Sequence, residues 1–435
     1  MSRDQRQMKL IVNMQPSGVH QGAWMAPGAN PRAFVDLDNY RRIARACERG
    51  RIDGVFLADF LALQPESSRQ PRWTLDPVVL LSALAAETTH LGLVCSISTT
   101  FSEPYQVARV VASLDHVSGG RTGWNVVTSF DPNSARNFGL ADLPEKADRY
   151  RRAGEFLDVV GALWSSWEPD ALALDPASGT FIDTAKVHPV DHDGEFFTVA
   201  GPLQVPPPPQ GRPVLFQAGA SGPGRDLAAR YADAVFAAQL TLESARDYRD
   251  GLRAGAVAAG RAADDVTLFP GVTVVVGETK EKAVAKRAAL DDLVGGAPAR
   301  LTSLEYFLGL EPGSLRVDET IPDAARVPTT SGTEGFRQAV VSFFDTPGRT
   351  VGDFLREGSI GHRSLVGDVT EVADDLERWF TEGAADGFVL MVDSSPDGVE
   401  SFVDLVVPEL QRRGLFRTEY DEDPRLGVRL GVRPG

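Results

Sequence analysis

The chain has 435 residues, of which 43% are hydrophobic and 24% charged, a balance typical of a globular protein with a substantial core. Its formal net charge of -16 disfavours nucleic acid and anionic membranes as partners. No apolar run approaches the roughly 20 residues needed to cross a bilayer, and only two cysteines occur, so we predict a cytoplasmic protein without disulfides.

Short apolar runs alternate with amphipathic stretches along most of the chain. The runs favour strands buried on both faces, because they are uniformly apolar. The expected strands cover 9–14, 54–59, 91–99, WNVVT at 124–128, 213–219, 233–239, 268–277 and 387–393. The expected helices cover 35–50, 76–88, 104–118, 145–164, 224–232, 241–259, a stretch from 279, and 398–414. Eight strand–helix units favour a (β/α)8 barrel over a doubly wound sheet.

Two segments interrupt this alternation, within an expected single barrel domain over residues 1–435. Residues 165–212 are rich in Asp, Gly and Pro, and HDGEFFTVAGPL predicts a hairpin within them. Residues 296–364 are polar and turn-rich, and they are longer than an ordinary connection. We expect both insertions to cover the mouth of the barrel.

Polar residues stand at the ends of several expected strands, where a barrel of this kind meets its ligands. Asp59 ends an otherwise apolar strand, Thr99 and Thr100 follow the next one, and Asn125 lies in the WNVVT strand. These side chains are candidates for ligand contact. Asp59 as a simple helix cap, and one threonine as a core residue, stay open as alternatives.

The stretch AGASGPGR at 218–225 is a candidate anion site. A strand runs into small, glycine-rich residues and then into a helix, so backbone amides around Gly222 can converge on a phosphate while Ser221 adds a hydroxyl. A tight turn whose glycines only satisfy backbone angles is the alternative.

His20 is the best catalytic candidate among the six histidines, because it follows the first strand at the expected active face. His188 and His192 lie four apart, but their segment is predicted to be a loop, so this spacing does not place them on one helix face and no metal site is predicted. The chain also lacks a GxGxxG loop, a P-loop, a nucleophile elbow and HExxH, so a nicotinamide cofactor is not indicated.

Several motifs occur in a fixed order along the chain. They are DGVFLAD, TTFSEPYQVARVVASLDHVSGGR, TGWNVVTS with ARNFG, RYRRAGEF, FQAGASGPGRDLAARYADAVF and DLVVPELQRRGLFRTEY. Together they resemble the nitrilotriacetate and dibenzothiophene sulfone monooxygenase branch of the bacterial luciferase-like superfamily. The likeness extends from NMQPSGVHQGAW to the last helix. It implies a luciferase-like (β/α)8 barrel.

The resemblance also implies a flavin site. Asp59, Thr99 and Thr100 would lie by the isoalloxazine ring, and Asn125 would hydrogen-bond the flavin from the pocket wall.

The same resemblance implies a phosphate site, where Tyr150 would reach the ribityl or phosphate region and Ser221 would bind the phosphate beside Gly222. The sequence departs from the family at one position: the residue four before the motif tyrosine is often His, and here it is Lys146. Positions four apart share a helix face, so Lys146 and Tyr150 can approach one ligand together. A lysine brings fixed positive charge where a histidine would be switchable.

The implied activity is that of a two-component monooxygenase. Such an enzyme takes reduced FMN from a separate NAD(P)H-dependent flavin reductase and, with O2 and through a flavin peroxide, oxygenates a small organic substrate. The insertions, His20 and Trp24 would set the choice of substrate, which could carry a C–N, C–S or sulfone group.

Two other functions fit the same fold: a non-catalytic flavin-binding protein, and a deazaflavin-dependent oxidoreductase of the superfamily. We also expect a homodimer or homotetramer, because VVLLSALAAE has an apolar face broader than one barrel needs.

Overall fold

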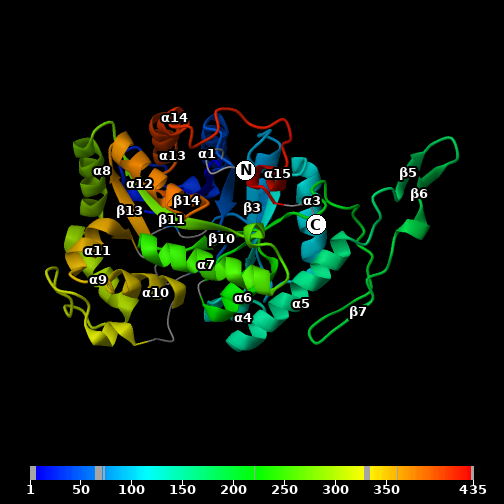
Figure 1. Cartoon of the computed structure of the whole chain (residues 1–435), viewed down its shortest axis with the longest axis horizontal. Helices are drawn as coiled ribbons and strands as arrows, with labels where there is room; N and C mark the ends of the chain where they lie inside the picture. Colours follow the sequence, from blue (N-terminus) through cyan, green and yellow to red (C-terminus); the bar gives the residue numbers. More distant parts are fainter. Residues whose placement is uncertain are drawn as a thin grey trace.

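Eight parallel strands form the centre of the molecule (Figure 1). The computed structural model describes residues 6–63, 71, 74–219, 221–327, 334–359 and 361–432. The strands pair in the order β1-β2-β3-β4-β9-β10-β11-β14, and β14 pairs with β1, which closes the ring. They are β1 (Lys9–Asn13), β2 (Gly54–Leu57), β3 (Gly92–Ser98), β4 (Thr122–Val127), β9 (Val214–Gln217), β10 (Ala234–Ala237), β11 (Thr267–Val276) and β14 (Gly387–Val392). The predicted barrel is therefore confirmed.

Helices follow the strands, and all those named here except α12 start within two residues of where the sequence predicts them. The side chain of Asp36 accepts the amide hydrogen of Asp38 at the start of α1, and Asp76 accepts those of Val78 and Val79 at the start of α2. These helices are α1 (Leu37–Arg49), α2 (Pro77–Ala85), α3 (Pro104–Ser118), α5 (Lys146–Trp164), α6 (Gly222–Tyr231), α7 (Leu242–Ala258), α8 (Lys280–Leu293) and α12 (Val369–Thr381). No helix in the described part of the chain is long and apolar enough to span a membrane.

The last predicted helix, 398–414, is divided. It consists of α13 (Asp397–Ser401), a π-helical turn η8 (Phe402–Val406) and α14 (Val407–Arg412). Pro408 stands in the first turn of α14, and proline has no amide hydrogen for the helical ladder. Short helices elsewhere are η2 (Ala23–Met25), η3 (Ala33–Val35), α4 (Pro132–Asn137) and η6 (Ala263–Asp265).

The barrel interior is a packed apolar core, closed at one end. Side chains from every barrel strand except β4 form one buried cluster: Ile11, Phe56, Val94, Val214, Phe216, Ala234, Phe269 and Val389. The terminal helix α15 (Leu426–Leu430) adds Leu426 and Leu430 to it. A β-carbon on Gly92 would lie 2.6 Å from Leu426, so α15 seals the end where the strands begin. Ligands therefore have to enter at the carboxyl ends of the strands, the barrel mouth.

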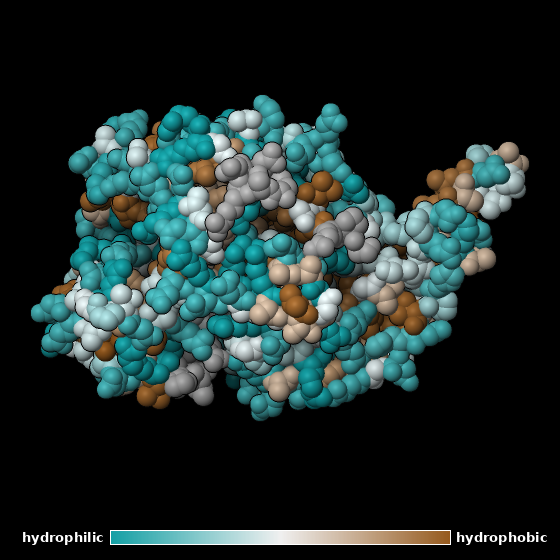
Figure 2. All heavy atoms as spheres, in the orientation of Figure 1, coloured by the Kyte–Doolittle hydropathy of each residue, from teal (hydrophilic) through white to brown (hydrophobic). Residues whose placement is uncertain are grey.

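The first insertion forms two hairpins. β7 (His192–Asp193) and β8 (Thr198–Val199) make the hairpin that HDGEFFTVAGPL predicts, which Glu155 of α5 holds by accepting the amide hydrogens of Phe196 and Phe197. β5 (Leu172–Asp175) and β6 (Thr180–Ile182), followed by η5 (Thr184–Lys186), form an arm that stands clear of the body (Figures 1 and 2).

The predicted covering role is wrong for this arm. Leu174 and Phe181 near its tip are 56% and 67% exposed, and the arm extends away from the barrel rather than over its mouth. Its polar composition resembles that of a covering loop, but the paired backbone of β5 and β6 holds it straight.

The second insertion packs against the barrel. It contains α9 (Gly296–Leu308), η7 (Asp323–Arg326), α10 (Glu334–Phe343) and α11 (Val351–Glu357), whose apolar side chains cluster on Ala238 and Leu240 just past β10. It ends in β12 (Gly358–Ser359) and β13 (His362–Gly367). β13 pairs in parallel with the second half of β11, whose first half pairs with β10, so β13 extends the wall above β10. The sequence did not indicate this strand.

Candidate active site

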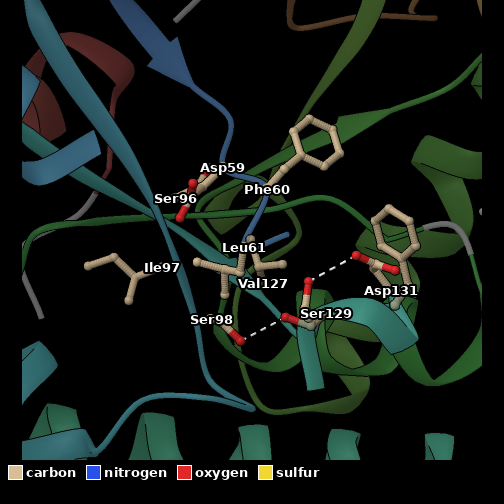
Figure 3. Close-up of a pocket in the computed structure, with 11 residues that line it drawn as sticks. Asp59, Phe60, Leu61, Ser96, Ile97, Ser98, Val127, Ser129 and Asp131 are labelled. Carbon is tan, nitrogen blue, oxygen red and sulfur yellow. Dashed lines mark hydrogen bonds between the residues drawn. The ribbon is translucent and has the colours of Figure 1, made fainter. Parts of the chain in front are cut away.

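A pocket that is open to solvent lies at the mouth between β2, β3 and β4. Figure 3 shows the side chains that line it, which come from the ends of these strands and from the segment that begins α4. The lining residues are Asp59, Phe60, Leu61, Ser96, Ile97, Ser98, Val127, Ser129, Phe130, Asp131 and Ser134.

Two serines of β3 present hydroxyls to this pocket, because side chains two apart on a strand share one face. Ser98 shares a hydrogen bond of 2.8 Å with Ser129 (Figure 3). Ser129 has a φ of 50°, a left-handed conformation that is uncommon for residues other than glycine and that often marks a functional site. The segment that follows β4 is further fixed, because Asn137 donates to the carbonyl oxygen of Leu61 at 2.8 Å.

Asp59 lies in the pocket wall, as the sequence predicted for a strand end. Burial, together with the charge of Asp76, raises the pKa of the Asp59 carboxyl from 3.8 to about 6. Near neutral pH this group therefore changes charge within reach of any ligand that fills the pocket.

Asn125 is buried next to the pocket, with 4% of its surface exposed. Its amide nitrogen donates to the Ser96 hydroxyl at 2.8 Å. Its Oδ1 is enclosed and has no hydrogen-bond partner among the described residues. A buried acceptor without a partner is costly unless a ligand supplies a donor, so Asn125 is well suited to bind one.

Thr99 and Thr100 lie beside the pocket, but their hydroxyls already have partners. The hydroxyl of Thr99 donates to the carbonyl oxygen of Val127 at 3.2 Å, and that of Thr100 donates to Thr128 at 2.8 Å. These bonds join the ends of β3 and β4. The threonines therefore brace the pocket, and their hydroxyl oxygens can only accept a hydrogen bond from a ligand.

Helix α5 connects this pocket to a second polar site. Arg149 donates to the carbonyl oxygens of Thr128 and Ser129, and Arg152 donates to that of Thr99. Tyr150, on the same helix, brings its hydroxyl within 3.4 Å of the Ser221 hydroxyl. Burial lowers the pKa of the Arg149 guanidinium.

The start of α6 has the features of the predicted anion site. Ser221 is the N-cap residue, yet its side chain makes no capping hydrogen bond, and Gly222 opens the first turn. A β-carbon on Gly224 would meet the Tyr150 hydroxyl at 3.1 Å and the Ser221 hydroxyl at 3.3 Å, so a larger residue at position 224 would crowd both hydroxyls. Lys146 is the first residue of α5, one turn before Tyr150, and is partly buried.

His20 and Trp24 lie apart from these two sites, in the loop after β1. The Nδ1 atom of His20 accepts the amide hydrogen of Gly22 at 3.0 Å, so the hydrogen is on Nε2, which donates to Asp291 of α8 at 3.0 Å. Both ring nitrogens are thus engaged. Trp24 is partly buried in η2.

Sequence reasoning missed several lining groups. Ser96 and Ser98 alternate with apolar residues in β3, and that alternation indicated which face they share. No comparable sequence signal marks Ser129, Asp131 or Arg149. A loop conformation places the first two at the pocket, and a long-range contact places Arg149. In the described part of the chain, no cluster of three or more His, Cys, Asp or Glu side chains could hold a metal ion.

Comparison with known proteins extends these observations. The profile of the family described as luciferase-like monooxygenase matches residues 15–386. Nitrilotriacetate monooxygenase component A of Aminobacter aminovorans is 41% identical over 431 residues, which cover 96% of this chain and 94% of that protein. Dibenzothiophene-sulfone monooxygenase of Rhodococcus erythropolis is 40% identical over 452 residues, covering 99% and 97%.

Solved structures agree with this assignment. The EDTA monooxygenase of Chelativorans sp. BNC1 superposes with a TM-score of 0.84 at 36% identity, covering 99% of both chains. A riboflavin lyase structure with modified FMN and riboflavin gives a TM-score of 0.84 at 34% identity, covering 99% of this chain and 97% of that one.

Proposed function

The chain belongs to the luciferase-like monooxygenase family, and from this premise we propose that it uses reduced FMN and O2 to oxygenate a small organic substrate with a C–N, C–S or sulfone group. In this reaction the flavin supplies two electrons, one oxygen atom enters the substrate and the other leaves as water. A separate NAD(P)H-dependent flavin reductase supplies the reduced FMN.

The observation that carries the proposal is the unpaired buried acceptor of Asn125, and the hydroxyl of Ser221, which is not used to cap its helix, supports it. The first suits a ring N–H of the flavin, and the second suits the phosphate at a helix start. Tyr150 and Lys146 on α5 lie on the phosphate side. The residues present therefore fit FMN.

The remaining pocket residues have defined tasks in this proposal. Asp59 and the hydroxyls of Ser96 and Ser98 orient the ring from the strand ends. Thr99, braced on the Val127 carbonyl, keeps the wall rigid, which favours a fixed position of the ring relative to the substrate. Asn137 ties the segment after β4 to the carbonyl oxygen of Leu61 and so fixes the rim of the pocket.

We also propose that the chain assembles as a homodimer or homotetramer through α2. Val79 of this helix is 68% exposed, although its neighbours Leu80 and Leu81 are buried in the core. Light scattering should therefore give a mass above the 46.8 kDa of one chain at micromolar concentration. A mass of one chain would contradict this assembly.

The proposed activity can be tested without knowing the substrate. Anaerobic protein is mixed with reduced FMN, then with aerated buffer, while the absorbance of oxidised flavin is followed. Binding should change the reoxidation rate from that of free reduced FMN, and the change should saturate as protein concentration rises. A rate equal to that of free flavin at every protein concentration would contradict the proposal.

A further inference from the structure

Two arginines share one carboxylate on the side of the mouth opposite the flavin pocket. Asp291 of α8 contacts Arg287 at 3.0 Å and Arg300 of α9 at 3.5 Å, and it accepts the hydrogen bond from His20. Burial alone would raise the pKa of Asp291, but the hydrogen bond from His20 and the two arginine charges outweigh it and lower that pKa. Asp291 is therefore ionised.

This cluster keeps an unbalanced positive charge in a poorly solvated place. The side chains of Arg287 and Arg300 are 14% and 23% exposed, and Asp291 can neutralise only one of them. Burial, followed by repulsion from Arg287, lowers the pKa of Arg300 to about 10, so it stays charged at neutral pH. The nearby Lys286 does not relieve the imbalance or add to it, because it pairs with Asp393 at 2.9 Å.

Both arginines have hydrogen-bonding capacity to spare. Arg287 donates to Asp291 and to the Ser364 hydroxyl, and Arg300 donates to Asp291 and to the carbonyl oxygen of Leu355. Each guanidinium has five N–H groups, and each uses two of them on described partners. A partly buried cation with free donors is stabilised by an anion, above all by a carboxylate that accepts two parallel bonds.

His362 is a further polar side chain on this side of the mouth. It is 7% exposed, and its ring lies parallel to that of Phe236 at 5.3 Å. Its Nδ1 is enclosed and has no hydrogen-bond partner in the described part of the chain. A β-carbon on Gly271 would come within 2.3 Å of that nitrogen, which leaves Nε2 as the nitrogen open to a ligand. Burial lowers the pKa of His362 to about 4, so the ring is neutral.

His362 and the arginine cluster face the same space. His362 and Ser364 are two apart on β13, so their side chains lie on one face of that strand. Ser364 is the group that Arg287 contacts, at 3.4 Å. Phe236 also contacts Phe56 of the barrel core, with ring centroids 5.7 Å apart, so this face of β13 belongs to the mouth.

We propose that this face binds a substrate that carries a carboxylate, with Arg287 and Arg300 on the carboxylate and His362 Nε2 on a neighbouring polar group. The proposal rests on the proposed function, since it names the substrate class for the same mouth. It requires no new chemistry, only recognition. His20 acts through Asp291 as a positioning residue, because its ring nitrogens are both engaged.

Wild-type protein without flavin provides the first test. Isothermal titration compares succinate with its neutral diamide, which has nearly the same shape, and with inorganic sulfate. Succinate should bind about tenfold or more tightly than the diamide, because only it can form charge-assisted bonds. Equal affinity for succinate and diamide would overturn the proposal. Sulfate binding as tightly as succinate would overturn the assignment to carboxylates.

Variants then locate the site. Arg287→Gln should weaken succinate binding about tenfold, and His362→Phe, which keeps the ring stacked, should weaken it severalfold. Lys282→Gln is the matched control, because Lys282 lies on α8 in an exposed pair with Glu278. Arg287→Lys keeps a charge beside Asp291 and should lose less, so it separates charge from misfolding. Unchanged succinate affinity in folded Arg287→Gln would contradict the proposal.

Failure of this inference is distinguishable from failure of the proposed function. Succinate binding is measured without flavin or O2, whereas the oxygenase test uses flavin without substrate. A protein that binds succinate through Arg287 but leaves flavin reoxidation unchanged would keep the anion site and lose the oxygenase. A protein that changes flavin reoxidation but does not bind succinate through Arg287 would support the oxygenase function and contradict the carboxylate site.

Discussion

The two halves of the barrel mouth offer opposite electrostatic surroundings. On the β2–β4 half, the pocket presents hydroxyls and Asp59, whose pKa is raised to about 6, with the Asn125 amide beside it. On the β13 and α8 half, Arg287 and Arg300 exceed the single carboxylate between them. A polar, weakly charged wall suits a flavin ring, and a cationic wall suits an anionic substrate. The difference in charge would therefore direct two ligands of the same mouth to opposite sides of it.

The largest effect is expected at Gly271, on the substrate half. Gly271→Ala would force a β-carbon against His362 and Phe236, so we expect the free energy of unfolding to fall by about 3 kcal/mol. Succinate affinity should fall while reduced FMN affinity holds. Urea titration and calorimetry measure the two effects. Gly251→Ala in α7, where a β-carbon meets nothing within 4 Å, should instead stabilise by about 0.5–1 kcal/mol. Equal losses of affinity for succinate and for reduced FMN would contradict the division of the mouth into two separate halves.

Ser221→Ala tests the phosphate contact on the flavin half of the mouth. It removes one hydrogen bond to a charged oxygen, so reduced FMN should bind more weakly by about 1.5–3 kcal/mol. Reduced riboflavin, which lacks the phosphate, should bind as before. Stability should change little, because Ser221 makes no capping bond. Anaerobic titrations of both flavins give the answer, and equal losses for the two would show that the turn is merely structural.

Arg149→Met should weaken the flavin half although Arg149 does not line the pocket. It leaves the carbonyl oxygen of Ser129 without its donor and that of Thr128 with only the Thr100 hydroxyl, so we expect a loss of about 2 kcal/mol in stability together with weaker flavin binding. Arg151→Met is the control, since its partners Asp148 and Glu195 are exposed and its effect should stay within about 0.5 kcal/mol. Chemical denaturation compares the two variants. Similar losses in both would mean that Arg149 does not hold the β4 end.

The smallest effect concerns pH. The pKa of Asp59 is raised in the folded chain, from 3.8 to about 6, so the fold favours the protonated form. The contribution of Asp59 to the free energy of unfolding should therefore fall as pH rises from about 4 to 6 and stay level above that. Asp59→Asn should remove this fall and be more stable than wild type by about 1 kcal/mol at pH 7, after allowance for partial exposure. Denaturation at several pH values measures this. A constant difference across that window would contradict the raised pKa.

Much of the barrel could be predicted because its strands obey one physical rule. Strands covered by helices outside and by core inside are apolar throughout, and GVFL or VLFQ shows this directly. β13, with the sequence HRSLVG, breaks the rule. Its Arg363 is buried between the rings of Trp379 and Phe388, and no local pattern reveals such a partner.

The candidate site was predictable where a strand end places the residue. Asp59 and Asn125 lie at the predicted pocket, and Ser221 with Tyr150 at the predicted turn. Their roles toward FMN stay predictions. The bond between His20 and Asp291 joins residues 271 apart, and the sequence gives no sign of it. The arginines of α8 and α9 carry no signal either, because their burial depends on how the second insertion packs.

Anaerobic equilibrium titration with reduced and with oxidised FMN tests the central claim most directly. A chain that receives reduced FMN from a reductase should bind the reduced form at least about tenfold more tightly, a difference of about 1.4 kcal/mol. Flavin fluorescence or calorimetry on the wild-type protein measures both affinities. Tighter binding of reduced FMN is the result we predict. Equal or tighter binding of oxidised FMN, or no binding of either, would contradict the account.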